Sequence, residues 1–87
     1  MQYEYDPIKS TANKEKHGID FEEAHALWDD SNSLEIRVDR PGEERHVIIA
    51  RLGELHWTAV ITYRGEAVRI ISVRRARKTE VELYEQR

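Results

Sequence analysis

The sequence predicts a single α+β domain over residues 1–87, in which a twisted antiparallel sheet has two helices before it and one helix after it. Hydrophobic residues at helical spacing occupy the first third of the chain and its C-terminal end. Between them, apolar and polar residues alternate as in half-buried strands, and only short turns separate these stretches. Such short turns join antiparallel neighbours, so the expected order is β-α-α-β-β-β-β-α.

A short strand and a helix are expected at the N-terminus. Tyr3 and Tyr5 alternate with polar residues, which is typical of a strand. Asp6 followed by Pro7 favours a helix start, because aspartate caps free amide groups and proline fits the first helical position. The helix should end near His17, since a glycine follows and the basic residues before it suit the negative end of the helix dipole.

A second helix is expected directly after that glycine. Asp20 and Glu23 have the spacing of a capping box, with aspartate in place of serine or threonine. An apolar stripe at helical spacing then follows, formed by Phe21, Ala24, Leu27 and Trp28.

Four strands and a final helix complete the expected fold. The strands should lie at residues 34–38, 45–52, 56–63 and 67–74. The turns between them are marked by Pro41-Gly42, Gly53-Glu54 and Arg64-Gly65-Glu66. Residues 76–87 should form the last helix, with Val81, Leu83 and Tyr84 facing the sheet.

Composition limits the classes of function. The chain has no cysteine, which excludes disulfides and thiolate zinc sites. It has no apolar run of the length of a membrane helix or of a secretory signal, so we expect a cytoplasmic protein that binds no membrane. Glu22 and His25 have metal-ligand spacing, but one such pair is a weak signal. We therefore expect neither a metal nor another cofactor.

Charge is unevenly distributed along the chain. Residues 64–78 include six basic residues and one acidic residue, a net charge of +5 within a chain whose net charge is −3. A basic segment on an acidic body indicates a site for a polyanion or a docking surface for an acidic partner. Arginines that only cover a solvated sheet edge would give the same pattern.

RNA cleavage is a reaction that these residue types can support without a metal. The ribose 2′-hydroxyl can attack the adjacent phosphate, so the protein must position the RNA, transfer protons and stabilise the added charge. Arginine can stabilise phosphate through bidentate hydrogen bonds. The proton-transfer group stays open among His17, Glu44, Tyr84 and a lysine.

The candidate residues come from the first helix, the start of the strand at residues 45–52, the last strand and the last helix. The catalytic candidates are Arg69, Arg74, Arg75, His17, Lys16 and Glu44. The RNA-binding candidates are Lys9, Asn13, Arg45, Arg77, Lys78 and Tyr84. Strand alternation predicts Arg69 and Arg75 on one face and Arg74 on the other. Alternatively, Arg69 forms a cross-strand ion pair and the other charged groups are ordinary solvated side chains.

Three stretches resemble the BrnT family of toxins. The first is YDPIKSTANKEKHGIDFEEA, residues 5–24, and the second is Glu44-Arg45 before an apolar strand. The third is RIISVRRARKTEVELYE, residues 69–85. Val73 stands where the family usually has alanine, and Arg75 where it often has lysine.

This resemblance implies a metal-independent endoribonuclease with a RelE-like fold, which acts as the toxin of a type II toxin–antitoxin system and inhibits translation. It also implies a hetero-oligomer with a BrnA-like antitoxin, whose ribbon-helix-helix part binds operator DNA. The chain would then meet operator DNA only through the antitoxin. Two alternatives are a non-catalytic binding module that acts as a co-repressor and a small structural protein.

Overall fold

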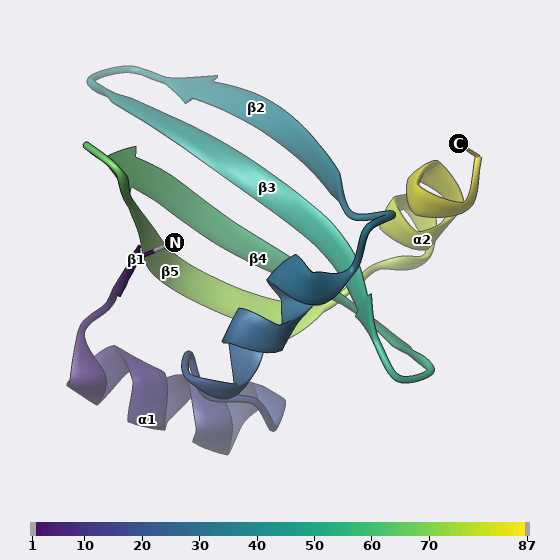
Figure 1. The fold of residues 1–87 in the computed structure, drawn as a ribbon, viewed down its shortest axis with the longest axis horizontal. Helices are drawn as coiled ribbons and strands as arrows, with labels where there is room; N and C mark the ends of the chain where they lie inside the picture. The colour runs from purple at the N-terminus through teal and green to yellow at the C-terminus, as the bar shows by residue number, and fades with distance from the viewer. Residues whose placement is uncertain (1, 87) are drawn as a thin grey trace.

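The computed structural model describes residues 2–86, which form a five-stranded sheet with helical segments on both faces (Figure 1). The α+β class predicted from the sequence is confirmed. The elements in chain order are β1 (Gln2–Glu4), α1 (Pro7–His17), the 3-10 helix η1 (Glu23–Asp29), β2 (Leu34–Arg40), β3 (Glu43–Leu52), β4 (Leu55–Arg64), β5 (Ala67–Arg75) and α2 (Lys78–Glu85).

The strand order of the sheet is β1-β5-β4-β3-β2. Strands β2 to β5 form the predicted antiparallel meander, but β1 runs parallel to β5. The prediction of a purely antiparallel sheet is therefore wrong. Short turns dictate antiparallel pairing only from β2 onward, whereas two helical segments separate β1 from β2 and allow it to join the far edge.

Both ends of α1 are formed as predicted. The side chain of Asp6 accepts a hydrogen bond from the backbone N–H of Ile8 at 2.9 Å. Gly18 has the left-handed φ of 84°, and its N–H donates to the Lys14 carbonyl at 2.9 Å. The signals are local, so the sequence alone locates this helix.

The predicted second α-helix is instead the short 3-10 helix η1, although its predicted capping box is present. Asp20 accepts from the N–H of Glu23 at 2.7 Å, and the Glu23 carboxylate accepts from the N–H of Asp20 at 3.0 Å. A segment of this length gains little from α-helical hydrogen bonds. Burial of Phe21, Ala24 and Leu27 holds it on the sheet instead.

The last helix is shorter than residues 76–87, and Arg87 lies outside the described residues. Val81 and Tyr84 are half-buried as predicted, but Leu83 is 46% exposed. A side chain two residues after Val81 points to nearly the opposite side of an α-helix, which explains the error. No side chain of α2 is fully buried.

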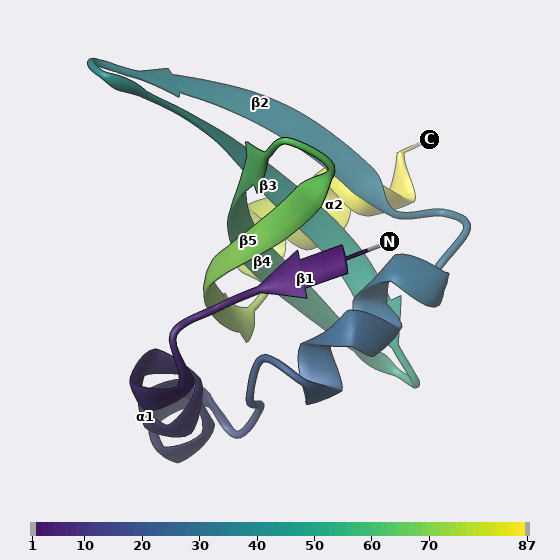
Figure 2. The same ribbon diagram turned by 60° about the vertical axis from the view of Figure 1, so that its left-hand side comes forward.

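The hydrophobic core lies between one face of the sheet and the layer formed by α1 and η1. Its buried residues are Ile19, Phe21, Ala24, Leu27, Ile48, Ala50, Trp57, Ala59, Ile61, Val68, Ile70 and Val73. Figure 2 shows α1 and the blue helical segment η1 along the lower side of the sheet, and α2 behind the strands. We call the face that α2 partly covers the open face. Among residues 2–86, no helix is both long and apolar enough to cross a membrane.

Candidate functional site

A bulge in β5 decides where its arginines point. Val60 pairs with Ser72, but the next residue of β4, Ile61, pairs with Ile70. Ile71 is therefore an extra residue on β5 without an opposite partner on β4. Such a bulge moves the following side chains to the other face of the sheet.

The bulge overturns the predicted arrangement of the three arginines. Val73 and Arg75 lie on the core side of the sheet, where the Arg75 guanidinium is 5.6 Å from the centre of the Trp57 ring. Arg69 and Arg74 both lie on the open face, since they alternate with buried residues on either side of the bulge. Strict alternation had predicted Arg69 with Arg75.

Three rows of side chains cross the open face from β2 to β5. The first row, nearest α2, is Leu34, Ile49, Thr58 and Arg74. The second row is Ile36, Val47, Val60 and Ser72. The third row is Val38, Arg45, Thr62 and Arg69, because the pairing of His46 with Ile61 brings the preceding Arg45 opposite Thr62. The second row is half-exposed, and Val38 of the third is 37% exposed.

Arg74 attaches α2 to the first row. Its two guanidinium nitrogens donate to the Glu80 carboxylate at 2.7 and 2.9 Å, and Thr58 donates to the same carboxylate at 3.0 Å. The hydrogen bonds from Arg74 lower the pKa of Glu80 to about 2, against the opposing effect of burial, and bonds from the Arg77 N–H and Thr58 assist. The guanidinium of Arg74 is thus already engaged in holding the helix.

Arg45 and Arg69 of the third row are each paired with one carboxylate, Arg45 through two nitrogens and Arg69 through a longer contact. Arg69 Nη1 is 3.4 Å from Glu4 Oε1, so the cross-strand ion pair that the sequence allowed is present. Arg45 contacts Glu43 at 3.0 Å. The two arginines are two strands apart, roughly 10 Å between backbones. The backbone of a single nucleic-acid strand could contact both arginines, because each side chain is partly exposed to solvent. Their ion pairs with carboxylates do not prevent this, since a surface ion pair contributes little to stability.

Asn13 has a structural role that the sequence did not predict. Strand β1 covers β5 only at residues 67–69, so Val73 lies on an uncovered edge. The Asn13 side chain accepts from the Val73 N–H at 3.2 Å and donates to the carbonyls of Val73 and Ile19, each at 2.8 Å. The amide thus replaces a missing strand partner and is buried.

The other candidates on α1 lie beside this edge. A hollow of about 260 Å³ is lined by Lys9, Ala12, Asn13, Lys16, His17, Phe21, Ile71 and Ser72. Ser72 also belongs to the second row, so the hollow adjoins the open face at the bulge. The structure therefore brings Lys9, Lys16 and His17 close to the strand that carries Arg69.

Other candidates lie away from this region. Glu44 contacts Arg37 and His46, each at 3.2 Å. Alternation along β3 directs its side chain to the same side of the sheet as the core residues Ile48 and Ala50. Arg77 and Lys78 are exposed at the start of α2. Within residues 2–86, no cluster of three or more histidine, aspartate or glutamate side chains is arranged to hold a metal ion.

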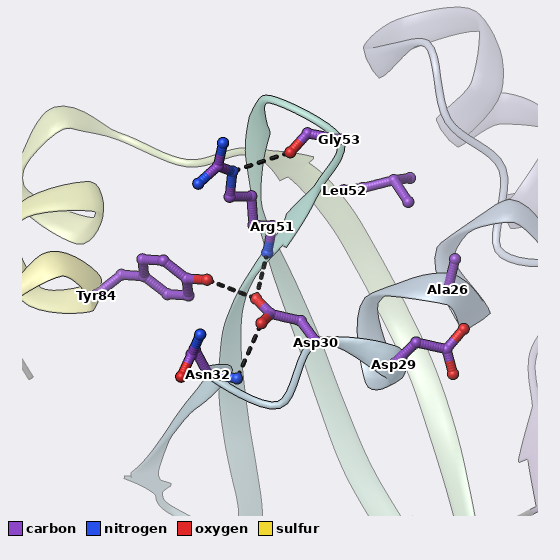
Figure 3. Close-up of a pocket in the computed structure, with 8 residues that line it drawn as sticks. All are labelled: Ala26, Asp29, Asp30, Asn32, Arg51, Leu52, Gly53 and Tyr84. Atoms are coloured by element: carbon purple, nitrogen blue, oxygen red, sulfur yellow. Dashed lines mark hydrogen bonds between the residues drawn. The ribbon is translucent and has the colours of Figure 1, made fainter.

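Tyr84 lines a separate pocket of about 450 Å³ (Figure 3). Its hydroxyl donates to Asp30 Oδ2 at 2.7 Å, and the backbone N–H of Arg51 donates to the same oxygen at 2.8 Å. The Asn32 N–H donates to the other carboxylate oxygen at 2.9 Å. These bonds link α2 to the loop after η1, and with Asp29 the pocket mixes both signs of charge.

The sequence can also be compared with known protein families. A family model described as "Ribonuclease toxin, BrnT, of type II toxin-antitoxin system" matches residues 5–80. The chain belongs to the BrnT family. This BrnT match supports a toxin role and ribonuclease activity, and such a system implies an antitoxin partner and an RNA substrate. No curated protein matches the chain.

Two carboxylates at the site of this BrnT-family chain were missed by sequence reasoning. Glu80 stands at the third helical position of α2, where an acidic residue signals a capping box, but that signal does not reveal its pairing with Arg74. Glu4 comes next to Arg69 only through the parallel β1–β5 pairing. No local pattern predicts a contact between residues so distant in the chain.

Proposed function

We propose that this chain is a metal-independent endoribonuclease toxin with a RelE-like fold, and that it inhibits translation by cleaving RNA. The observation that carries the proposal is the placement of Arg45 and Arg69 in one row of the open face, while cations of α1 line a hollow at the edge of β5 that extends to Ser72 of the second row. Arginines on a half-exposed surface can bind successive phosphates of a single strand.

In this proposal, Arg69 and Arg45 bind the RNA backbone and stabilise the charge that develops on the phosphate. The 3.4 Å contact of Arg69 with Glu4 is long, and a phosphate offers this guanidinium two oxygens at once. Binding of RNA would therefore replace a weak internal anion by a stronger external one.

His17 is our proposed proton-transfer group, since it is the only candidate histidine and it lines the hollow beside the bulge. Lys9 and Lys16 line the same hollow and would contact phosphates. Arg74 would act indirectly, by holding α2 at the end of the open face. We place Glu44, Arg75 and Tyr84 outside the reacting centre.

We further propose a cytoplasmic hetero-oligomer with a BrnA-like ribbon-helix-helix antitoxin, through which the toxin reaches operator DNA. The family supports an antitoxin partner of some kind. The half-exposed apolar second row, with arginines on both sides, would suit an acidic, partly apolar segment of that partner.

A second candidate function is a non-catalytic binding module that acts as a co-repressor. The observation that favours it is that each of the three open-face candidates has a carboxylate partner: Arg45 with Glu43, Arg69 with Glu4 and Arg74 with Glu80. Internal neutralisation of this kind reduces the attraction for RNA.

The decisive experiment incubates the purified chain with single-stranded RNA in excess chelator. We expect cleavage that persists without metal and leaves 2′,3′-cyclic phosphate ends, because the 2′-hydroxyl is the nucleophile. Arg69→Ala should slow cleavage at least about 100-fold, as loss of a charge-stabilising group does. Intact RNA in the presence of folded wild-type protein would instead favour the co-repressor.

A further inference from the structure

We infer that Thr62 and Arg64 of β4 complete the RNA-binding surface, Thr62 by accepting a hydrogen bond from a ribose 2′-hydroxyl and Arg64 by binding a backbone phosphate. The inference rests on the proposed function. With the acceptor of Thr62, a surface that attracts any polyanion would also distinguish RNA from DNA, because the 2′-hydroxyl is the group that differs between them.

The position of Thr62 supports this role. It lies in the third row between Arg45 on β3 and Arg69 on β5, about 5 Å from each neighbouring strand. A nucleotide whose phosphates contact the two arginines must pass its ribose over the residue between them. Thr62 is half-exposed on the open face.

The hydrogen bonding of Thr62 determines what it can recognise. Its hydroxyl donates to the backbone carbonyl of Glu44 at 3.0 Å, so the hydrogen is already used and the side chain is fixed. The oxygen keeps lone pairs that can only accept. An ionised phosphate oxygen has no hydrogen to donate to the Thr62 oxygen, whereas the 2′-hydroxyl of a ribose has one.

Arg64 follows Thr62 by two residues at the end of β4, so alternation directs it to the same face. It is exposed, and within residues 2–86 its side chain makes no ion pair or hydrogen bond. The nearest acidic residue of the facing strand, Glu43, already pairs with Arg45. Arg64 can therefore bind phosphate without breaking an ion pair between described residues, unlike the three paired arginines.

The experiment compares an RNA oligonucleotide with DNA of the same sequence, using kcat/KM for RNA cleavage and Kd for uncleaved DNA at low salt. Thr62→Val keeps the shape of the side chain and removes the acceptor. We expect kcat/KM for RNA to fall about five- to tenfold, as expected for one lost hydrogen bond, with Kd for DNA unchanged. Thr62→Ser, which keeps the acceptor, should restore RNA cleavage.

Thr11→Val is the matched control, because Thr11 on α1 also donates to a backbone carbonyl, that of Pro7 at 3.1 Å. We expect it to change neither quantity. Arg64→Gln should weaken the binding of RNA and DNA alike and reduce the slope of log Kd against log salt by about 0.7, the amount expected for one phosphate contact with a single strand. Arg51→Gln, at the opposite end of the sheet, should leave that slope unchanged.

The outcomes separate the inference from the proposed function. Wild-type cleavage with equal effects of Thr62→Val on RNA and DNA, or with no effect on either, would overturn the role of Thr62 and leave the nuclease intact. An unchanged salt slope in Arg64→Gln would remove Arg64 from the surface. Absence of RNA cleavage by the wild type would remove the nuclease itself, and the inference with it.

Discussion

At Val73, the side chain of Asn13 forms the two backbone hydrogen bonds that a neighbouring strand would otherwise form. Three hydrogen bonds connect its amide to Val73 and Ile19, and the side chain is only 7% exposed. Such a group cannot be replaced by one that only donates or only accepts. The asparagine of the opening motif therefore joins α1, the following loop and β5.

We predict that Asn13→Ala lowers the free energy of unfolding by about 2–3 kcal/mol, because it leaves buried backbone groups unpaired. Asn13→Asp should be no better, since a carboxylate cannot donate to the two carbonyls. Urea unfolding followed by circular dichroism measures both. Glu15→Ala, at an exposed position of the same helix, is the control. A wild-type midpoint in Asn13→Ala would contradict the structural role.

The contact between Arg69 and Glu4 leads to a prediction about affinity. Glu4→Gln removes an internal anion that competes with phosphate, so we expect RNA to bind about two- to fivefold more tightly. Stability should change little, because a partly exposed pair at 3.4 Å contributes less than about 1 kcal/mol. Glu15→Gln makes the same change of net charge on α1. Equal tightening in both variants would mean that only net charge matters.

The sequence predicted these residue types but not their partners. Arg69 was expected to meet either phosphate or a cross-strand carboxylate, and the structure contains the carboxylate. Neither Glu4 nor Glu80 could be named in advance, because their positions depend on the β1–β5 pairing and on the docking of α2. Pairing between distant segments leaves no periodic pattern in the chain.

At the scale of elements, α2 is held by polar contacts more than by burial. It has no fully buried side chain, and its Glu80 binds Arg74 and Thr58 while Tyr84 binds Asp30. We predict that Glu80→Gln weakens hydrogen-exchange protection across α2 and lowers the free energy of unfolding by about 1–2 kcal/mol, an amount reduced by solvent screening.

The same pair predicts a pH dependence. Because folding lowers the pKa of Glu80 from 4.5 to about 2, its contribution to stability is fully present above pH 4.5 and is lost as pH falls toward 2. Urea midpoints of wild type and Glu80→Gln should therefore converge across this range. A constant difference between them would mean that the ionised pair is not what holds the helix.

Elements with local signals were predicted well, and the others were not. Asp6 and Gly18 cap the two ends of α1 as expected, and the turns of the meander lie at the predicted glycines. The β5 bulge was missed, although two adjacent apolar residues, Ile70 and Ile71, interrupt the alternation there. One extra residue was enough to move Arg74 to the face of Arg69 and Arg75 away from it.

Considered as a whole, the molecule is acidic but does not present its charges evenly. Its net charge is −3, yet five cations lie around the bulge and along the end of the sheet that carries the third row: Lys9, Lys16, Arg45, Arg64 and Arg69. Binding of RNA should thus depend on a few direct phosphate contacts and not on a general attraction to the protein. The net charge of the body opposes approach from any other side.

We therefore predict a steep but bounded salt dependence of RNA affinity. Each phosphate contact with a single strand adds about −0.7 to the slope of log K against log salt, so three to five contacts give a slope of roughly −2 to −3.5. Raising salt from about 50 to about 200 mM should then weaken binding roughly 20- to 100-fold. Fluorescence anisotropy with a labelled oligonucleotide measures this directly. A flat response would favour the co-repressor or a purely structural protein, since neither needs phosphate contacts, and a much steeper one would require cations far outside the open face.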